Sequence, residues 1–171
     1  MAERIIAFPP VAPPGARLLI LGSMPSVESL NQGFYYAHPR NAFWRILAEV
    51  YAEPFPEDIP GRIALLERHG IALWDVLHSC QRQGSLDSAI REAEVNDFAG
   101  LFDRCPGIER VLFNGATAHD LFVKHAARYL DGRQWACMPS TSPAYTLSYE
   151  RKLAQWREAL RPVTKYEHQP L

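Results

Sequence analysis

The chain has 171 residues, of which 47% are hydrophobic and 22% are charged, and its formal net charge is −1. This length and composition are typical of one globular domain whose core folds without disulfides or metals. The apolar runs are shorter than the roughly 18 residues that a membrane span requires, which excludes a membrane protein. Prolines interrupt the region where a secretory signal would need an apolar run, so we expect a cytoplasmic protein.

Several classes of site have no support in the sequence. Three cysteines, Cys80, Cys105 and Cys137, are too few and too scattered for a disulfide framework. The histidines do not have metal-ligand spacing, and we expect neither a metal nor another cofactor. Motifs for dinucleotide binding, nucleoside triphosphate hydrolysis and serine hydrolysis are also missing from the sequence.

The charges are unevenly distributed along the chain. Basic residues outnumber acidic ones in residues 1–45 and 104–165, whereas acidic residues dominate 46–103. If the two basic segments share one face, that face would attract a polyanion. A solvated mixture of charges explains the counts equally well.

The first part of the chain combines an arm, a strand, a loop and a helix. Prolines predict that residues 1–16 form an extended arm rather than an element. The apolar run 17–21 predicts a strand buried on both faces. Residues 22–40 show no regular period and predict a long, functional loop. An apolar face then predicts a helix over 42–51, with Asn41 placed at its N-cap.

Helical and strand patterns alternate in the rest of the chain. The pattern predicts helices over 58–70, 97–104, 118–129 and 149–160, the second of them capped by Asn96, and strands over 71–76, 109–113 and 134–138. This alternation indicates an α/β fold, a three-layer αβα sandwich around a central, mainly parallel four-stranded sheet. We expect residues 1–171 to form this single domain.

Chemically suggestive residues concentrate where the predicted strands end. In open α/β sheets, ligands bind beyond the carboxyl ends of the strands. Each segment alone could serve only to turn the chain, cap a helix or plug the sheet, but their coincidence favours a binding site. The four segments are GSMPS at 22–26, GFYYAHPRNAFW at 33–44, VLFNG at 111–115 and PSTSPA at 139–144.

In this order, the four segments resemble the uracil-DNA glycosylase superfamily. The pattern GF-x-x-A-x-P-x-N-x-FW is similar to its mismatch-specific uracil/thymine branch, and the whole set more closely resembles the hypoxanthine-DNA (deoxyinosine) glycosylases. The similarity extends from about residue 17 to residue 160. It implies a base excision repair enzyme that flips a deaminated base out of DNA and hydrolyses its N-glycosidic bond. The sequence leaves the choice between hypoxanthine and uracil open.

Two side chains match the needs of base recognition. Asn114 presents a donor and an acceptor side by side, as does the lactam edge of uracil or hypoxanthine, although it could instead close a turn. Tyr36 aligns with the aromatic that stacks on the flipped base in the mismatch-specific branch. Phe34 and Tyr35 are close competitors for this stacking role.

The catalytic group departs from the pattern of the superfamily. Many members place aspartate or asparagine where this chain has Met24, which can neither activate nor orient a water. The resemblance therefore moves the catalytic role to Asn41, matching the asparagine considered catalytic in the hypoxanthine branch. An amide can hold a water in line with the anomeric carbon, and capping of the next helix is the alternative role.

The remaining candidates bind substrate or DNA. Substrate-binding candidates also include the loop GSMPS at 22–26, called the first loop below, and His38. The His38 side chain could donate a hydrogen bond to the base or to a phosphate. Hydroxyls and backbone N–H groups of the loops can bind DNA phosphates. The candidates beyond those named above are Gly22, Ser23 and Pro25 for substrate, and Ser26, Ser140, Thr141 and Ser142 for DNA.

The leading hypothesis is a monofunctional DNA glycosylase. The four segments contain no lysine that could form a Schiff base, so a lyase step is not expected. We expect a monomer that acts on damaged double-stranded or single-stranded DNA. A catalytically weak lesion-binding protein of the same fold and a flavodoxin-like module for a small molecule are the alternatives.

Overall fold

A four-stranded parallel sheet forms the centre of the computed structural model, which describes residues 3–161. The strand order is β3-β2-β6-β7. Every residue of the two strands at one side, β2 and β3, is buried, because helices cover both faces of the sheet. The expected sheet is confirmed, and its strands are β2 (Leu18–Gly22), β3 (Ile71–Asp75), β6 (Arg110–Asn114) and β7 (Gln134–Met138).

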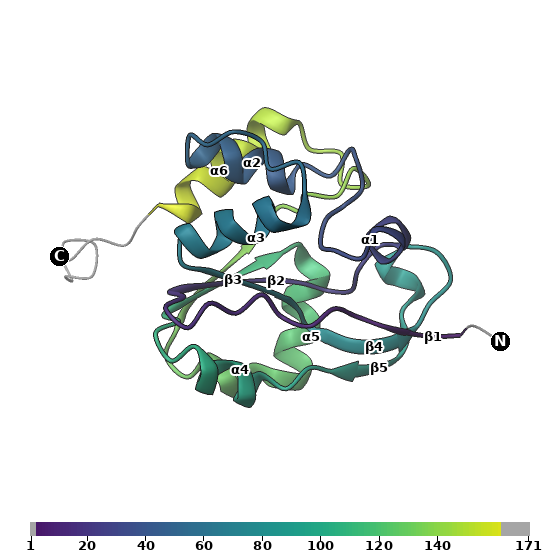
Figure 1. Ribbon diagram of the computed structural model, residues 1–171. Coiled ribbons are helices and arrows are strands. Elements are labelled where there is room, and N and C mark those ends of the chain that lie inside the picture. Colours follow the sequence, from purple (N-terminus) through teal and green to yellow (C-terminus); the bar gives the residue numbers. More distant parts are fainter. Residues whose placement is uncertain (1–2, 162–171) are drawn as a thin grey trace.

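Helices form the two outer layers of the sandwich (Figure 1). One face of the sheet carries α2 (Phe43–Val50), α3 (Ile59–Arg68) and α6 (Tyr149–Leu160). The other face carries α4 (Phe98–Arg104) and α5 (Ala116–Ala126). The three-layer architecture is therefore as predicted. Within residues 3–161, no helix is both long and apolar enough to cross a membrane.

A second sheet was not expected from the sequence. It is antiparallel, with the order β1-β4-β5, and consists of β1 (Arg4–Ile6), β4 (Leu77–Gln81) and β5 (Arg91–Val95). The described part of the 1–16 segment is thus not purely an arm, because β1 pairs with β4 and Val11 bridges Leu73. The charged, largely exposed sequence of β5 has no apolar face that would reveal a strand.

Three local expectations were wrong. The long loop over 22–40 contains the helix α1 (Val27–Gln32), which is too short to show a helical period. Asp97 rather than Asn96 caps α4, because the Asp97 side chain accepts from the N–H of Gly100. The helix expected to reach residue 129 ends at Ala126, and a 3-10 turn, η2 (Ala127–Leu130), follows it.

Strand register brings the carboxyl ends of the parallel strands to one edge. Gly22 at the end of β2 lies opposite Asp75 at the end of β3. On the other side of β2, Asn114 at the end of β6 lies opposite Met138 at the end of β7. This edge holds the ends of all four parallel strands, as the sequence predicted.

Candidate active site

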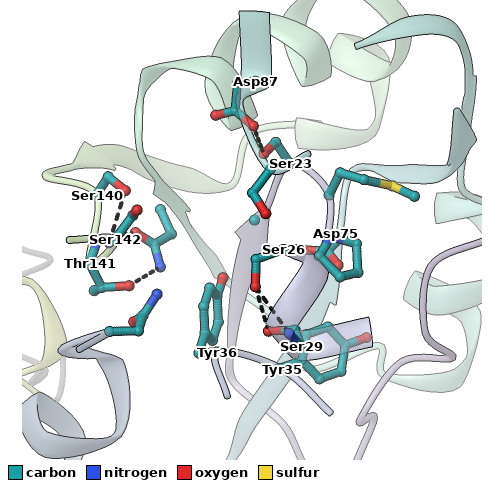
Figure 2. Close-up of a pocket in the computed structure, with 16 residues that line it drawn as sticks. Ser23, Ser26, Ser29, Tyr35, Tyr36, Asp75, Asp87, Ser140, Thr141 and Ser142 are labelled. Carbon is teal, nitrogen blue, oxygen red and sulfur yellow. Dashed lines mark hydrogen bonds between the residues drawn. The ribbon is translucent and has the colours of Figure 1, made fainter. Parts of the chain in front are cut away.

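The carboxyl ends of β2, β3 and β6 open on a cavity of about 130 Å³ (Figure 2). Loops 22–26 and 33–42, the β4–β5 connection at Ser85 and Asp87, and the loop before α6 form the rest of its wall. All the predicted site residues except His38 line this cavity. They are Gly22, Ser23, Met24, Pro25, Ser26, Tyr36, Asn41, Asn114, Ser140, Thr141 and Ser142.

The amide of Asn114 is held in one orientation by Thr141. Its Oδ1 accepts from the backbone N–H of Thr141 at 2.9 Å, and its Nδ2 donates to Thr141 Oγ1 at 2.9 Å. A backbone N–H can only donate, so the amide oxygen must face it. One N–H and one lone pair of the Asn114 amide remain for a ligand or for the Tyr36 hydroxyl, which faces this amide. Thr141 itself is 1% exposed, and its hydroxyl is directed at Asn114 rather than outward.

Asn41 makes the cap contact expected for the start of α2. Its Oδ1 accepts from the N–H of Phe43 at 3.0 Å, one position earlier than expected, because the N-cap position itself is Ala42. The amide nitrogen has no partner among residues 3–161, and Asn41 also lines the cavity. Capping therefore leaves Nδ2 and one lone pair of Oδ1 for another contact.

Tyr36 crosses the cavity in a conformation that is unusual for a tyrosine. Its φ is +52°, in the left-handed region, and its ring packs on Phe43 with centroids 4.2 Å apart. Figure 2 shows the ring between Thr141 and Asp75. Of the competing aromatics, Phe34 stacks on Trp44 away from the cavity lining, whereas Tyr35 lines the cavity but is buried, and its hydroxyl donates to the Pro9 carbonyl at 2.8 Å.

Gly22 allows two side chains to meet above the end of β2. A Cβ atom at this position would lie 2.5 Å from Asp75 Oδ1 and 2.7 Å from the Tyr36 hydroxyl. Real Cβ atoms essentially never approach other atoms so closely. The glycine that opens the first loop is therefore needed for the close approach of Asp75 and Tyr36.

Asp75 is a site residue that the sequence analysis missed. It is 3% exposed, it lines the cavity, and its Oδ2 has no hydrogen-bond partner among the described residues. Burial, together with the smaller effect of the Asp87 charge, raises the pKa of its carboxyl to about 7, and Arg82 acts in the opposite direction. The available signal was an acidic residue ending a buried apolar run at the ligand-binding edge of the sheet.

The loop hydroxyls shape the rim of the cavity. Ser23 Oγ donates to Asp87 Oδ1 at 2.8 Å, and Ser26 caps α1 by accepting from the N–H of Ser29 at 3.1 Å. In the loop before α6, Ser140 Oγ accepts from the N–H of Ser142 at 3.2 Å. These serines therefore hold the loops in place, and each hydroxyl keeps further hydrogen-bonding capacity.

A basic groove adjoins the cavity and shares Tyr36 and Asn41 with it. We define this groove by its cationic residues, and no acidic residue of the described part of the chain lines it. His38 lies here rather than in the cavity, and its Nδ1 accepts from the N–H of Arg40 at 3.0 Å. The cationic residues are Arg40, Arg45, Arg62 and Lys152.

In residues 3–161, the side chains that could bind a metal are not clustered, and the cysteines form no disulfide. No group of three or more histidine, cysteine, aspartate or glutamate side chains is placed to hold a metal ion in this part of the chain. The three cysteines are unpaired, with Cys80 and Cys105 buried and Cys137 exposed.

Comparison with known proteins agrees with the resemblance seen in the sequence. The family model described as the uracil DNA glycosylase superfamily matches residues 9–163. The chain is 34% identical to the hypoxanthine DNA glycosylase of Methanosarcina barkeri strain Fusaro and 33% identical to that of Methanosarcina acetivorans. Each match covers 155 residues, 90% of this chain and 96% of the relative.

A solved structure has the same fold. The solution NMR structure of a candidate uracil DNA glycosylase from Methanosarcina acetivorans matches with a TM-score of 0.80 and 32% identity, covering 93% of this chain and 98% of the other. The chain belongs to the uracil DNA glycosylase superfamily. This assignment removes the alternative of a flavodoxin-like module for a small molecule.

Proposed function

We propose that this protein is a monofunctional DNA glycosylase that excises hypoxanthine from DNA by hydrolysis. Membership of the superfamily and the two relatives named hypoxanthine DNA glycosylase support this substrate. The observation that carries the proposal is the Asn114 amide, which Thr141 fixes in one orientation beside a cavity. A fixed amide of this kind distinguishes bases by the order of donor and acceptor on their edge.

Deaminated bases suit the free half of the Asn114 amide. The lactam edge of hypoxanthine or uracil presents an N–H beside a carbonyl, which matches an acceptor beside a donor. Adenine and cytosine present an amino group beside an unprotonated nitrogen. The N–H of a fixed amide would then face the amino group of the base, and two donors cannot form a hydrogen bond. Sites that leave buried polar groups unpaired in this way discriminate by roughly 10⁴-fold.

Tyr36 is the proposed platform for the flipped base. One face of its ring packs on Phe43, and the residue lines the cavity next to Asn114. Stacking of a base on an aromatic ring contributes about 1–3 kcal/mol and accepts different ring systems. The Tyr36 ring therefore supplies affinity, and Asn114 supplies selectivity.

Asn41 is the proposed positioning group for the attacking water. Its free Oδ1 lone pair can accept a hydrogen bond from a water and direct it at the anomeric carbon as the glycosidic bond breaks. Met24 lines the same cavity but offers no group that could bind the water in this way. Among residues 3–161, no lysine lines the cavity, which supports hydrolysis rather than a Schiff-base lyase step.

The basic groove is the proposed path of the DNA backbone. Its arginines adjoin the cavity, and the exposed Arg40 and Arg45 can neutralise phosphates next to a flipped nucleotide. Lys152 is 4% exposed and donates to the Ser142 carbonyl, so it holds the loop before α6 instead. Ser23, Ser26, Ser140 and Ser142 can add hydrogen bonds at the rim, but the buried Thr141 is better assigned to positioning Asn114. One chain supplies all of these groups, which supports a monomer acting on double-stranded or single-stranded DNA.

Base release under single-turnover conditions tests the proposal. Duplexes containing deoxyinosine, deoxyuridine or only normal bases are incubated with the wild-type chain and the Asn41→Ala and Asn114→Ala variants. We expect release of hypoxanthine by the wild type and a loss of at least about 100-fold in each variant, the effect of one catalytic group. Binding to lesion duplexes without any alkali-labile abasic product would instead identify a lesion-binding protein.

A further inference from the structure

We propose that Asp75 is a second base-reading residue, whose protonated carboxyl donates a hydrogen bond to an unprotonated ring nitrogen of the flipped purine. This inference rests on the proposed function and deepens it, because it explains selection of a deaminated purine rather than a deaminated pyrimidine. Neither the sequence pattern nor the resemblance assigns a role to this residue.

The position of Asp75 is that of a ligand-contacting group. It ends β3 opposite Gly22, and Figure 2 places it across Tyr36 from Thr141, the residue that holds Asn114. It is almost completely buried in the cavity wall, with Oδ2 unpaired among the described residues. Native proteins pair nearly all such atoms, so an unpaired carboxyl oxygen in a cavity wall is available to pair with a ligand.

The surroundings of Asp75 favour its neutral form. The charged and titratable groups that face it are Asp87 from η1 (Asp87–Ala89), Arg82 after β4, and Tyr35 and Tyr36 from loop 33–42. Burial is the largest cause of its raised pKa of about 7, and the single cation Arg82 does not offset burial and the charge of Asp87. Arg82 is instead bonded to the carbonyls of Gly84 and Pro25. A neutral carboxyl is a hydrogen-bond donor, whereas a carboxylate only accepts.

The hydrogen-bond donor on the Asp75 carboxyl explains why the cavity prefers a purine to a pyrimidine. Hypoxanthine carries unprotonated ring nitrogens in addition to its lactam edge, and these are acceptors. Uracil has the same lactam edge and a second carbonyl, O2, but on the side where hypoxanthine carries N7 its C5–C6 edge presents only carbon-bound hydrogens. With N7 as the acceptor, bound uracil would therefore leave the Asp75 hydroxyl unpaired, and unpaired buried groups discriminate strongly between ligands.

The first test is the pH dependence of hypoxanthine release. Single-turnover rates on a deoxyinosine duplex are measured between about pH 5 and pH 9. In the wild type we expect the rate to fall as the pH rises through about 7, because ionisation of Asp75 removes the donor. The Asp75→Asn variant keeps an N–H donor that does not titrate, so its rate should be flat over the same range. Asp87→Asn removes a charge that favours protonation, so its decline should begin at lower pH.

The second test identifies the acceptor on the base. Affinity is measured in the Asn41→Ala background for duplexes with deoxyinosine, 3-deazadeoxyinosine or 7-deazadeoxyinosine, each with Asp75 or with Asp75→Leu. We expect the leucine to weaken deoxyinosine binding by about 10- to 100-fold, the effect of one lost hydrogen bond. One of the two deaza bases should show no such loss, because it lacks the nitrogen that accepts from Asp75.

Three results would overturn the assignment of Asp75. They are a wild-type rate that is flat or rises with pH through 7, an Asp75→Asn profile identical to the wild type, and equal loss of affinity for all three bases. If the leucine variant does not fold, the near-isosteric asparagine variant still decides through its pH profile. Failure of the proposed function has a different signature, since the wild type would then release no base at any pH.

Discussion

At the scale of single residues, the site depends on contacts that only particular side chains can make. Asn114 reads a base edge only because Thr141 occupies the other half of its amide. Asp75 and Tyr36 approach each other only because position 22 has no side chain. A small change at a residue that acts by leaving room for its neighbours should therefore have a large effect on base release.

Gly22→Ala tests the close approach at the end of β2. The new Cβ would lie 2.5 Å from Asp75 Oδ1 and 2.7 Å from the Tyr36 hydroxyl, so both side chains must move. We expect hypoxanthine release to fall by more than about 10-fold, because misplacement by about 1 Å can cost on the order of 100-fold. Gly15→Ala is the control, since its Cβ would meet nothing within 4 Å. Equal activity of the two variants would refute the role of Gly22.

Sequence patterns predicted some site residues and could not predict others. Tyr36, Asn41 and Asn114 were found because they stand in segments that end strands or resemble a known family, and the structure brings them to one cavity. Asp75 was missed because what distinguishes it is the raised pKa of its carboxyl. That pKa depends on burial and on the charges of Asp87 and Arg82, and neither neighbour stands in a motif that the sequence analysis used. The hydrogen bonds of Thr141 were equally invisible, so it was assigned to phosphate binding.

At the scale of elements, Arg82 ties two segments of the cavity wall together. Its side chain is buried, and it donates to the carbonyl of Pro25 in the first loop and to that of Gly84 after β4. These two hydrogen bonds hold the first loop next to the segment that leads into η1, which carries Asp87. Hydrogen bonds from a charged donor in a buried setting are among the stronger stabilising contacts.

Arg82→Met should loosen this wall and destabilise the fold. Two carbonyls lose a charged donor, and we expect the free energy of unfolding to fall by about 2–4 kcal/mol. Thermal or denaturant unfolding measures the effect. Arg91→Met is the matched control, because Arg91 is exposed and bonds only to the nearby carbonyls of Ser88 and Ile90. A change below about 0.5 kcal/mol in both variants would contradict this role of Arg82.

The strands also differ in how well the sequence predicted them. The parallel strands were predicted to within one residue at each end because each is an apolar run between turn signals. The antiparallel sheet was missed because β1 has three residues and β5 is charged and exposed. Pairing across the chain, rather than local sequence, makes these segments strands.

At the scale of the whole molecule, one hydrophobic core joins the two sheets. It includes residues of β2 and β6 from the parallel sheet and Leu77 and Cys80 from the antiparallel sheet. This continuity supports the proposal that residues 1–171 form one domain. The basic groove brings Arg40, Arg45 and Arg62 to one surface, so folding gathers there a positive charge that the net charge of −1 conceals.

Salt dependence of DNA affinity tests the basic groove. Each phosphate contact adds about 0.9 to the slope of log affinity against log salt concentration. We expect Arg40→Gln to lower that slope by about 1 for any DNA sequence, since phosphate contacts do not read bases. Arg91→Gln, on the exposed strand β5, should leave the slope unchanged. A slope that stays the same in Arg40→Gln would place the DNA backbone elsewhere.

The central claim is that the oriented amide of Asn114 selects the base, and one comparison tests it most directly. The single-turnover rate of hypoxanthine release is divided by the rate of adenine release from the same duplex sequence, with Asn114 intact and with Asn114→Ala. The account predicts a ratio on the order of 10⁴ that collapses by at least about 100-fold in the variant. A variant that releases hypoxanthine with undiminished selectivity would contradict it.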